Sequence, residues 1–212
     1  MAAGSAVAGG RPFSINHDLK KGSRFLPDTF SMWAWNICEV TRSPPWAILP
    51  TDVLIRAGHR RIGYVNGEAS MEASRHRLRG YRQALATADL PFDPDLAREG
   101  NWQPLSGYEA TLALMALPSP PTAIFCANDL MAVGCYEALR ELALQIPQDV
   151  AVMGYDDREI AQHLHPPLSS VLLPHFEMGT IAAEILIDAA AGSASRPRQI
   201  KVECPIVRRK SV

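Results

Sequence analysis

From Thr51 onward the chain alternates short apolar runs with longer amphipathic stretches, and short polar loops separate them. A short apolar run between turn residues is typical of a buried strand, whereas apolar residues spaced by three and four are typical of a helix. Strand–helix alternation with short loops favours parallel βαβ units. We therefore expect an α/β fold, a Rossmann-like parallel sheet flanked by helices. The expected strands are 61–67, 122–127, 149–156 and 169–174, with weaker candidates at 99–102 and 200–207.

Capping and stop signals set the limits of the expected helices. Ser106 and Glu109 form a capping box, which predicts a helix start. Either Asn128 or Asp129 caps the helix that follows the strand 122–127. The full set consists of a helix ending at Gly58, 71–89, one from Ser106 to Pro118, one ending before Pro147, and 177–191 stopped by Gly192.

Residues 1–50 differ in character from the rest. They hold three of the four tryptophans and five prolines, and they show no sustained period of 2 or 3.6. We interpret 1–50 as an atypical N-terminal segment that is partly disordered, with a short helix over 28–40 as the best candidate element.

Composition excludes several classes of protein. A formal net charge of -1 gives no general attraction to nucleic acid or anionic lipid. No apolar stretch reaches the roughly 18 residues that a membrane-spanning helix needs, and the first residues make a poor secretory signal. The four scattered cysteines form no CxxC and fit a reducing cytoplasm. We expect a cytoplasmic protein without membrane contact.

Ligands of open parallel sheets bind beyond the carboxyl ends of the strands. Asn128 and Asp156 each follow an expected strand, so their side chains should share one crevice. An amide and a carboxylate together can hold vicinal hydroxyls, which suits a sugar or a nucleoside. The alternative is that both residues only cap helices or turns, where Asn and Asp are common.

Two further residues belong to the same end of the expected sheet. Arg77 lies in the first turns of the helix 71–89 and could offer a planar fork of donors to a hydroxyl or carboxylate; alternatively it is one of several solvated arginines. Trp102 follows a weak strand and could stack on a sugar ring, although a lone tryptophan is more often core or rim packing.

No motif indicates an enzyme, a cofactor or a metal. The chain has no G-x-S-x-G, H-E-x-x-H or GxxxxGK[ST] sequence. His163 and His165 have no third ligand nearby in sequence, so a structural or surface role is favoured. Asp156 and Asp157 are adjacent, so their side chains should diverge rather than act as an acid–base pair. The basic run 208–210 is expected to be solvated.

A set of motifs occurs in order along the chain: AGHRRIGYVNG, RLRGYRQAL, REGNW, SGYEAT, PTAIFCANDLMAVG, IPQDVAVMGYDD and HPPLSSV. Together they resemble the effector-binding region of the LacI/GalR family of bacterial transcription regulators, from about Thr51 to about Val207. The resemblance implies the type I periplasmic-binding-protein-like fold, in which a ligand sits between two Rossmann-like lobes. It implies effector contacts at Arg77, Trp102, Asn128 and Asp156, and it favours a saccharide.

The resemblance also implies a division of the chain. Residues 51–212 correspond to the effector-binding domain, with 51–171 as a complete C-terminal lobe and 172–212 as crossover helix and strands. The helix-turn-helix domain and most of the N-terminal lobe of family members have no match in 1–50. The chain is therefore expected to be a truncated regulator whose helix 177–191 lacks the usual partner of its apolar face (Ile181, Ile185, Leu186). Residues 25–49, another subunit or nothing could cover that face.

The function implied is that of an effector-sensing domain. It would bind a small carbohydrate and control the DNA binding of the full-length regulator, a homodimer that contacts operator DNA only through a domain absent from this chain. The alternative is a stand-alone periplasmic-type sugar-binding protein. Because one lobe offers half of a two-lobed cleft, we expect weak or undetectable sugar binding by this chain alone.

Overall fold

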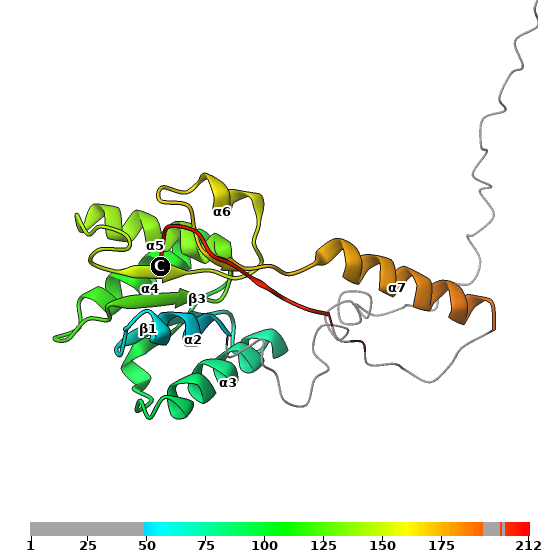
Figure 1. The fold of residues 1–212 in the computed structure, drawn as a ribbon, viewed down its shortest axis with the longest axis horizontal. Helices are drawn as coiled ribbons and strands as arrows, with labels where there is room; N and C mark the ends of the chain where they lie inside the picture. The colour runs from blue at the N-terminus through cyan, green and yellow to red at the C-terminus, as the bar shows by residue number, and fades with distance from the viewer. Residues whose placement is uncertain (1–48, 193–199, 201) are drawn as a thin grey trace, which may run out of the picture.

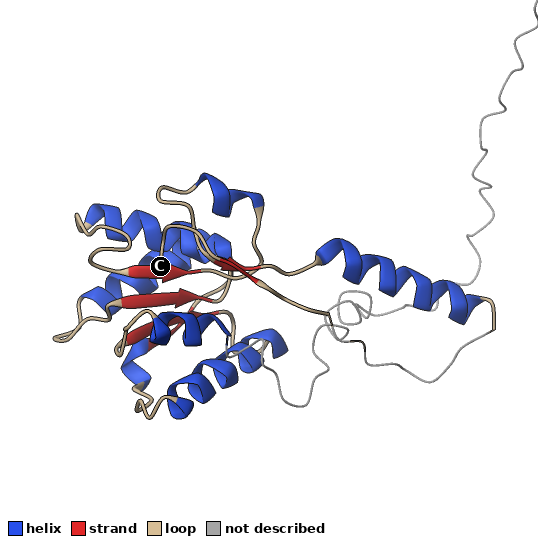
Figure 2. Ribbon diagram, in the orientation of Figure 1, coloured by secondary structure: helices blue, strands red, loops and turns tan. Residues whose placement is uncertain are grey.

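The computed structural model describes residues 49–192, 200 and 202–212. In these residues four strands form a parallel sheet with the order β2–β1–β3–β4 (Figure 2). The strands are β1 (Ile62–Asn66), β2 (Ala97–Glu99), β3 (Ala123–Cys126) and β4 (Ala151–Met153). Every residue of β1, β3 and β4 is buried, as is typical of parallel strands covered on both faces. The expected α/β fold with a Rossmann-like parallel sheet is confirmed.

Helices cover both faces of this sheet. The helices α2 (Leu49–Arg56) and α3 (Glu72–Thr87) lie on one face, and α4 (Pro104–Met115) and α5 (Asp129–Glu141) lie on the other (Figure 1). The right-handed connections of βαβ units account for this, because the chain reverses direction across the sheet after β2.

Aromatic side chains fill the space between α3 and the sheet. The Tyr64 ring stacks on Tyr81 with centroids 4.9 Å apart and on Phe125 at 5.2 Å. Both tyrosine hydroxyls are satisfied, since Tyr81 donates to the Ile62 carbonyl at 2.8 Å and Tyr64 donates to Asn66 Oδ1 at 2.7 Å. These rings are therefore buried in the core with both hydroxyl groups hydrogen-bonded.

The chain then leaves the sheet and returns to it. It forms α6 (Glu159–His163), β5 (Ser170–Val171), α7 (His175–Ala190) and β6 (Ile206–Val207), and β5 pairs antiparallel with β6. Near its end the chain lies along β4, because the Val152 amide donates to the Ser211 carbonyl at 2.8 Å and Ser211 Oγ donates to the Val152 carbonyl at 2.6 Å.

Several expected boundaries were wrong. The helix α4 begins at Pro104, not at a Ser106–Glu109 capping box, because proline is preorganised for the first helical position. Ser106 Oγ instead donates to the Gln103 carbonyl at 2.9 Å and accepts from the Asn101 amide at 3.0 Å.

The expected strands also differ in length and position from those observed. The weak strand 99–102 is observed earlier, at Ala97–Glu99. The expected strand 169–174 shortens to Ser170–Val171, and of 200–207 only Ile206–Val207 is strand among the described residues. The five-residue helix α6 was not predicted, because a segment this short shows no helical period.

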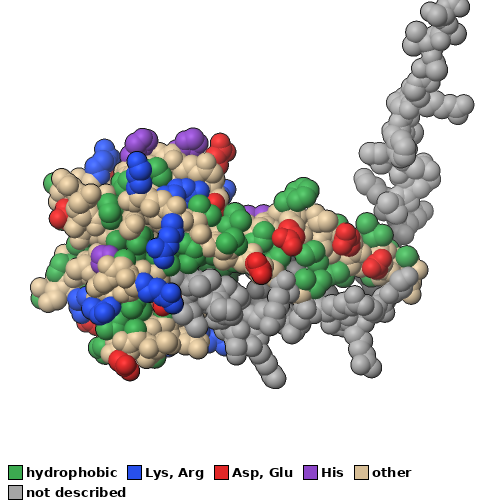
Figure 3. Space-filling view, viewed as in Figure 1, with side chains coloured by type: hydrophobic (Ala, Val, Ile, Leu, Met, Phe, Trp, Pro, Cys, Tyr) green, Lys and Arg blue, Asp and Glu red, His purple; other side chains and the backbone are tan. Residues whose placement is uncertain are grey.

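The helix α7 extends away from the sheet (Figure 1). None of its described residues is buried, and Phe176, Leu186 and Ile187 are 89%, 52% and 67% exposed. Figure 3 shows apolar and acidic side chains along this helix. This exposure is measured among the described residues alone. The segment 1–48, with its candidate helix over 28–40, lies outside them. Within the described part of the chain, no helix is long and apolar enough to cross a bilayer.

The crossing of α4 and α5 generates a testable prediction. A Cβ atom at Gly134 would lie 1.8 Å from the Pro104 carbonyl oxygen, so the two backbones touch there. We expect Gly134→Ala to lower the free energy of unfolding by about 3 kcal/mol, because backbone cannot yield as a side-chain tip can. Urea denaturation followed by circular dichroism measures this.

Gly179 in α7 is the matched control, because a Cβ there would meet nothing within 4 Å. Gly179→Ala should raise helix stability by up to about 1 kcal/mol. Equal effects of the two substitutions would contradict the close crossing.

Candidate functional site

The structure brings the four predicted residues together at the carboxyl ends of the strands. Arg77 comes from the second turn of α3, Trp102 from the loop after β2, Asn128 from the residue before α5, and Asp156 from the loop after β4. Three independent contacts join them, as the next paragraphs describe. The four side chains predicted from the strand ends therefore lie close together in the fold.

Arg77 is the centre of this group. Its side chain is buried, with a residue exposure of 5%, so it is not one of the solvated arginines. Nη1 donates to the Ala127 carbonyl at 2.5 Å, and Nη2 lies 3.5 Å from Asp156 Oδ1. The guanidinium carbon lies 3.9 Å from the centroid of the Tyr155 ring and 5.2 Å from that of Trp102. Carbonyl, carboxylate and rings together offset the desolvation of the cation.

Asn128 both caps a helix and belongs to the site. Its Oδ1 accepts from the Met131 amide at 2.8 Å, which is the N-cap bond of α5. Its Nδ2 donates to the Trp102 carbonyl at 3.0 Å. The cap interpretation is confirmed, and the same side chain fixes the backbone of the neighbouring tryptophan.

Trp102 is held in an uncommon backbone conformation, with φ at +66°. Its indole ring lies against Gly67, where a Cβ atom would come within 2.1 Å of the ring. Its Nε1 donates to Met71 Sδ at 3.2 Å. Glycine at position 67 is therefore required by the close approach of the ring.

Asp156 is mostly buried and faces cations. Its side chain is 17% exposed, and burial raises the pKa of its carboxyl group, while Arg77, His175 and Arg158 act in the opposite direction. The residue has φ at +106° and Asp157 has φ at +51°. The loop after β4 thus holds two consecutive residues in the left-handed region.

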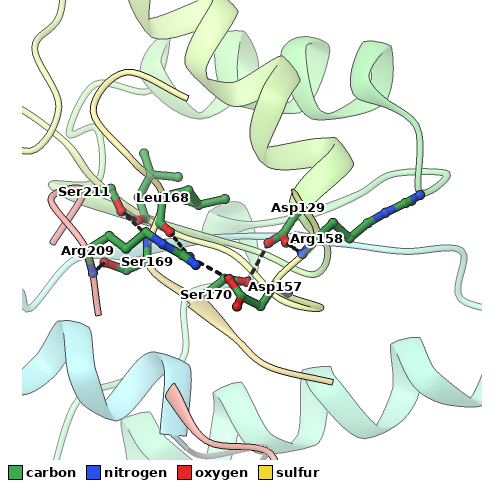
Figure 4. Close-up of polar contacts among 9 residues, drawn as sticks. Asp129, Asp157, Arg158, Leu168, Ser169, Ser170, Arg209 and Ser211 are labelled. Atoms are coloured by element: carbon green, nitrogen blue, oxygen red, sulfur yellow. Dashed lines mark hydrogen bonds and ion pairs between the residues drawn. The ribbon is translucent and has the colours of Figure 1, made fainter. Parts of the chain in front are cut away.

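Asp157 turns away from Asp156, as expected for adjacent residues. Its Oδ1 accepts from Arg209 Nη1 at 2.6 Å, and the two side chains are 9% and 15% exposed. Figure 4 shows this pair beside Leu168 and Ser169. The expectation of a solvated basic run at 208–210 was wrong for Arg209, because the chain end returns to the loop after β4.

Sequence reasoning missed two residues of the site. Tyr155 supplies the ring under Arg77, and its position directly before Asp156 at a strand end was the available signal. Asp129 is fully buried, and its carboxylate accepts from Ser170 Oγ at 2.6 Å and from the Arg158 amide at 2.7 Å. Sequence reasoning treated it only as a possible cap.

The chemistry available here is hydrogen bonding and stacking. The site offers a guanidinium, a carboxylate, an amide and a partly exposed indole. Among the described residues, no group of three His, Cys, Asp or Glu side chains could hold a metal ion.

Comparison with known proteins identifies the fold family. A family model described as "Periplasmic binding protein-like domain" matches residues 51–212. The chain belongs to this family. Its relatives are LacI-type transcription regulators.

Two curated relatives and one solved structure illustrate the similarity. The ribose operon repressor of Haemophilus influenzae is 38% identical over 164 residues, covering 77% of this chain and 49% of the repressor. The regulator CelR of Thermobifida fusca is 37% identical over 161 residues, covering 76% and 47%. The solved transcriptional regulator CelR–cellobiose complex superposes with a TM-score of 0.76 at 36% identity, covering 78% of this chain and 51% of that one. The chain spans about half the length of the curated relatives it matches.

The Asp157–Arg209 pair generates the prediction for this region. Arg209→Met leaves the Asp157 carboxylate buried without its cation, and Arg209 also donates to the Leu168 carbonyl at 2.8 Å. We expect the free energy of unfolding at pH 7 to fall by about 3 kcal/mol, measured by urea denaturation.

The double variant Arg209→Met with Asp157→Asn tests the reason. Asparagine tolerates the left-handed backbone and carries no charge, so it should recover a large part of the loss. A double variant no more stable than Arg209→Met alone would show that the charge pair is not the cause.

Proposed function

We propose that residues 51–212 are the effector-sensing region of a LacI-type transcription regulator and that the effector is a small carbohydrate. The observation that carries the proposal is the cluster in which Arg77, Asp156 and Trp102 meet at the strand ends. Such a cluster suits a polyhydroxylated ring, because it combines charged hydrogen-bonding groups with an aromatic surface.

Each side chain has a distinct role in this proposal. The Asp156 carboxylate accepts bonds from two neighbouring hydroxyl groups, and Arg77 donates to a ring or hydroxyl oxygen. Arg77 Nη1 donates to the Ala127 carbonyl, and Nη2 forms an ion pair with Asp156 at 3.5 Å; each of these nitrogens carries two hydrogens. Trp102 stacks on the C–H face of the sugar. Asn128 contributes through the Trp102 backbone and through any remaining amide hydrogen.

The family relatives support a regulator rather than a stand-alone periplasmic binding protein, since they include a ribose operon repressor and CelR. In our proposal the effector changes how the whole regulator binds operator DNA, through parts outside residues 51–212. We place the regulator in the bacterial cytoplasm, where the DNA is, and as a homodimer, because operator half-sites usually mirror a two-fold protein.

The proposal is tested by titrating the full chain with D-ribose and with cellobiose. The Trp102 indole N–H resonance is followed by NMR, which detects even millimolar affinity. We expect a saturable shift with one of these sugars and a Kd weaker than micromolar, because a single lobe encloses only part of a ligand. Micromolar affinity would contradict the expectation for one lobe, and no shift with either sugar would count against the proposed ligand class.

A matched pair of variants locates the binding. Asp156→Asn should raise the Kd by about tenfold or more, since a hydrogen bond to a charged group is lost. Asp149→Asn is the control, because Asp149 accepts from the Gln145 amide in the loop before β4, at the opposite end of the sheet. Equal Kd values for the two variants would place the ligand elsewhere.

A further inference from the structure

A fully buried carboxylate, that of Asp129, lies next to the four-residue cluster. Asp129 is the first residue of α5, directly after Asn128, and its amide donates to the Tyr155 carbonyl at 2.9 Å. Its carboxylate receives the Ser170 hydroxyl on Oδ1 and the Arg158 amide on Oδ2 (Figure 4). Gly154 makes room for this group, because a Cβ there would lie 2.3 Å from Asp129 Oδ1.

The loop between β4 and α6 needs support from outside itself. Asp156 and Asp157 both have positive φ, a conformation that costs a non-glycine residue about 1 kcal/mol or more. Such a loop persists only when its surroundings determine it. The Arg158 amide, which follows directly on the two left-handed residues, is bound by Asp129.

The same carboxylate connects the loop to the strand that leaves the sheet. Ser170 lies in β5, donates to Asp129, and accepts from the Asp157 amide at 3.2 Å. Arg209 binds the Asp157 carboxylate, and its amide donates to Ser169 Oγ at 2.9 Å. The loop, β5 and the chain end therefore form one network.

We propose that Asp129 is a positioning residue for effector binding. Through the Arg158 amide and the Ser170 hydroxyl it fixes the loop that carries Asp156 and joins that loop to β5. The expected effect on effector affinity rests on the proposed function. In this proposal Asp129 acts through Asp156 and does not touch the ligand.

Burial makes this carboxylate sensitive to pH. Desolvation raises the pKa of Asp129 to about 7; the Ser170 and Arg158 hydrogen bonds lower it, and Asp156 and Asp157 raise it further. Cys126 of β3 and Tyr136 of α5 also interact with it electrostatically. The charged groups around the loop are Asp156, Asp157, Arg77, Arg158, Arg209 and His175.

The direction in which effector affinity changes with pH distinguishes a positioning role of Asp129 from a purely structural one. Because the pKa of Asp129 is raised above its usual 3.8, its contribution to stability is present below about pH 4 and is lost as pH rises through about 7. The ionised carboxylate accepts the Ser170 and Arg158 bonds on its two oxygens, whereas protonation of one oxygen weakens it as an acceptor and requires the Ser170 hydroxyl to reverse. Effector affinity should therefore rise over the pH range in which the stability contribution falls.

The experiment uses the full chain and the variant Asp129→Asn, whose amide cannot accept both bonds. At pH 7.5 we expect faster hydrogen exchange at the Arg158 amide and a Kd for D-ribose or cellobiose about fivefold higher. We also expect the affinity to lose its rise between pH 6 and 8. Ser170→Ala keeps the Asp129 carboxylate and should show the same changes to a smaller degree. This variant tests the inference if Asp129→Asn does not fold.

Two controls accompany these variants. Asp149→Asn should leave Arg158 exchange and affinity unchanged. His175→Asn should keep the pH-dependent affinity, which tests whether His175, an electrostatic neighbour of Asp156, causes it. Unchanged Arg158 exchange in Asp129→Asn would overturn the inference even if no sugar binds, and a retained affinity rise with pH would overturn it where a sugar does bind.

Discussion

A buried cation organises the site end of this domain. Removing a guanidinium from water is costly unless its donors meet acceptors. Arg77 meets the Ala127 carbonyl at the end of β3 and the Asp156 carboxylate after β4, with the Tyr155 ring beneath it. These partners stand in the right places only when the strands are paired in register. The geometry of the site therefore depends on correct pairing of the strands.

The residues around Arg77 also hold one another in place. Asn128 closes the first turn of α5 and holds the Trp102 carbonyl. Gly67 leaves the space in which the Trp102 indole ring lies. Such preorganisation limits the entropy lost on binding. It also explains why functional side chains on loops can be placed accurately, since the loops are anchored to rigid strands and helices.

The outer part of the molecule contrasts with this rigid centre. The helix α7 keeps apolar side chains exposed, while β5, which precedes it, bonds to the loop carrying Asp156 and pairs with β6. The match covers about half of each of these relatives, and their other half has no counterpart in it. The network from Asp129 to Ser170 and Arg209 joins the loop carrying Asp156 to these outgoing segments.

The local pattern of the sequence determined the parallel α/β sheet, since buried apolar runs and amphipathic periods depend only on neighbouring residues. It also determined that Asn128 and Asp156 follow strands and so share one edge. The start of α4 was misplaced, because two competing local signals, Pro104 and Ser106, lie two residues apart. Only the tertiary structure decided that Arg77 is buried, that Arg209 returns to Asp157, and that Asp129 supports the site from behind. Those facts depend on contacts between residues 29 to 79 positions apart, and side-chain burial at that range is set by how the layers pack rather than by sequence neighbours.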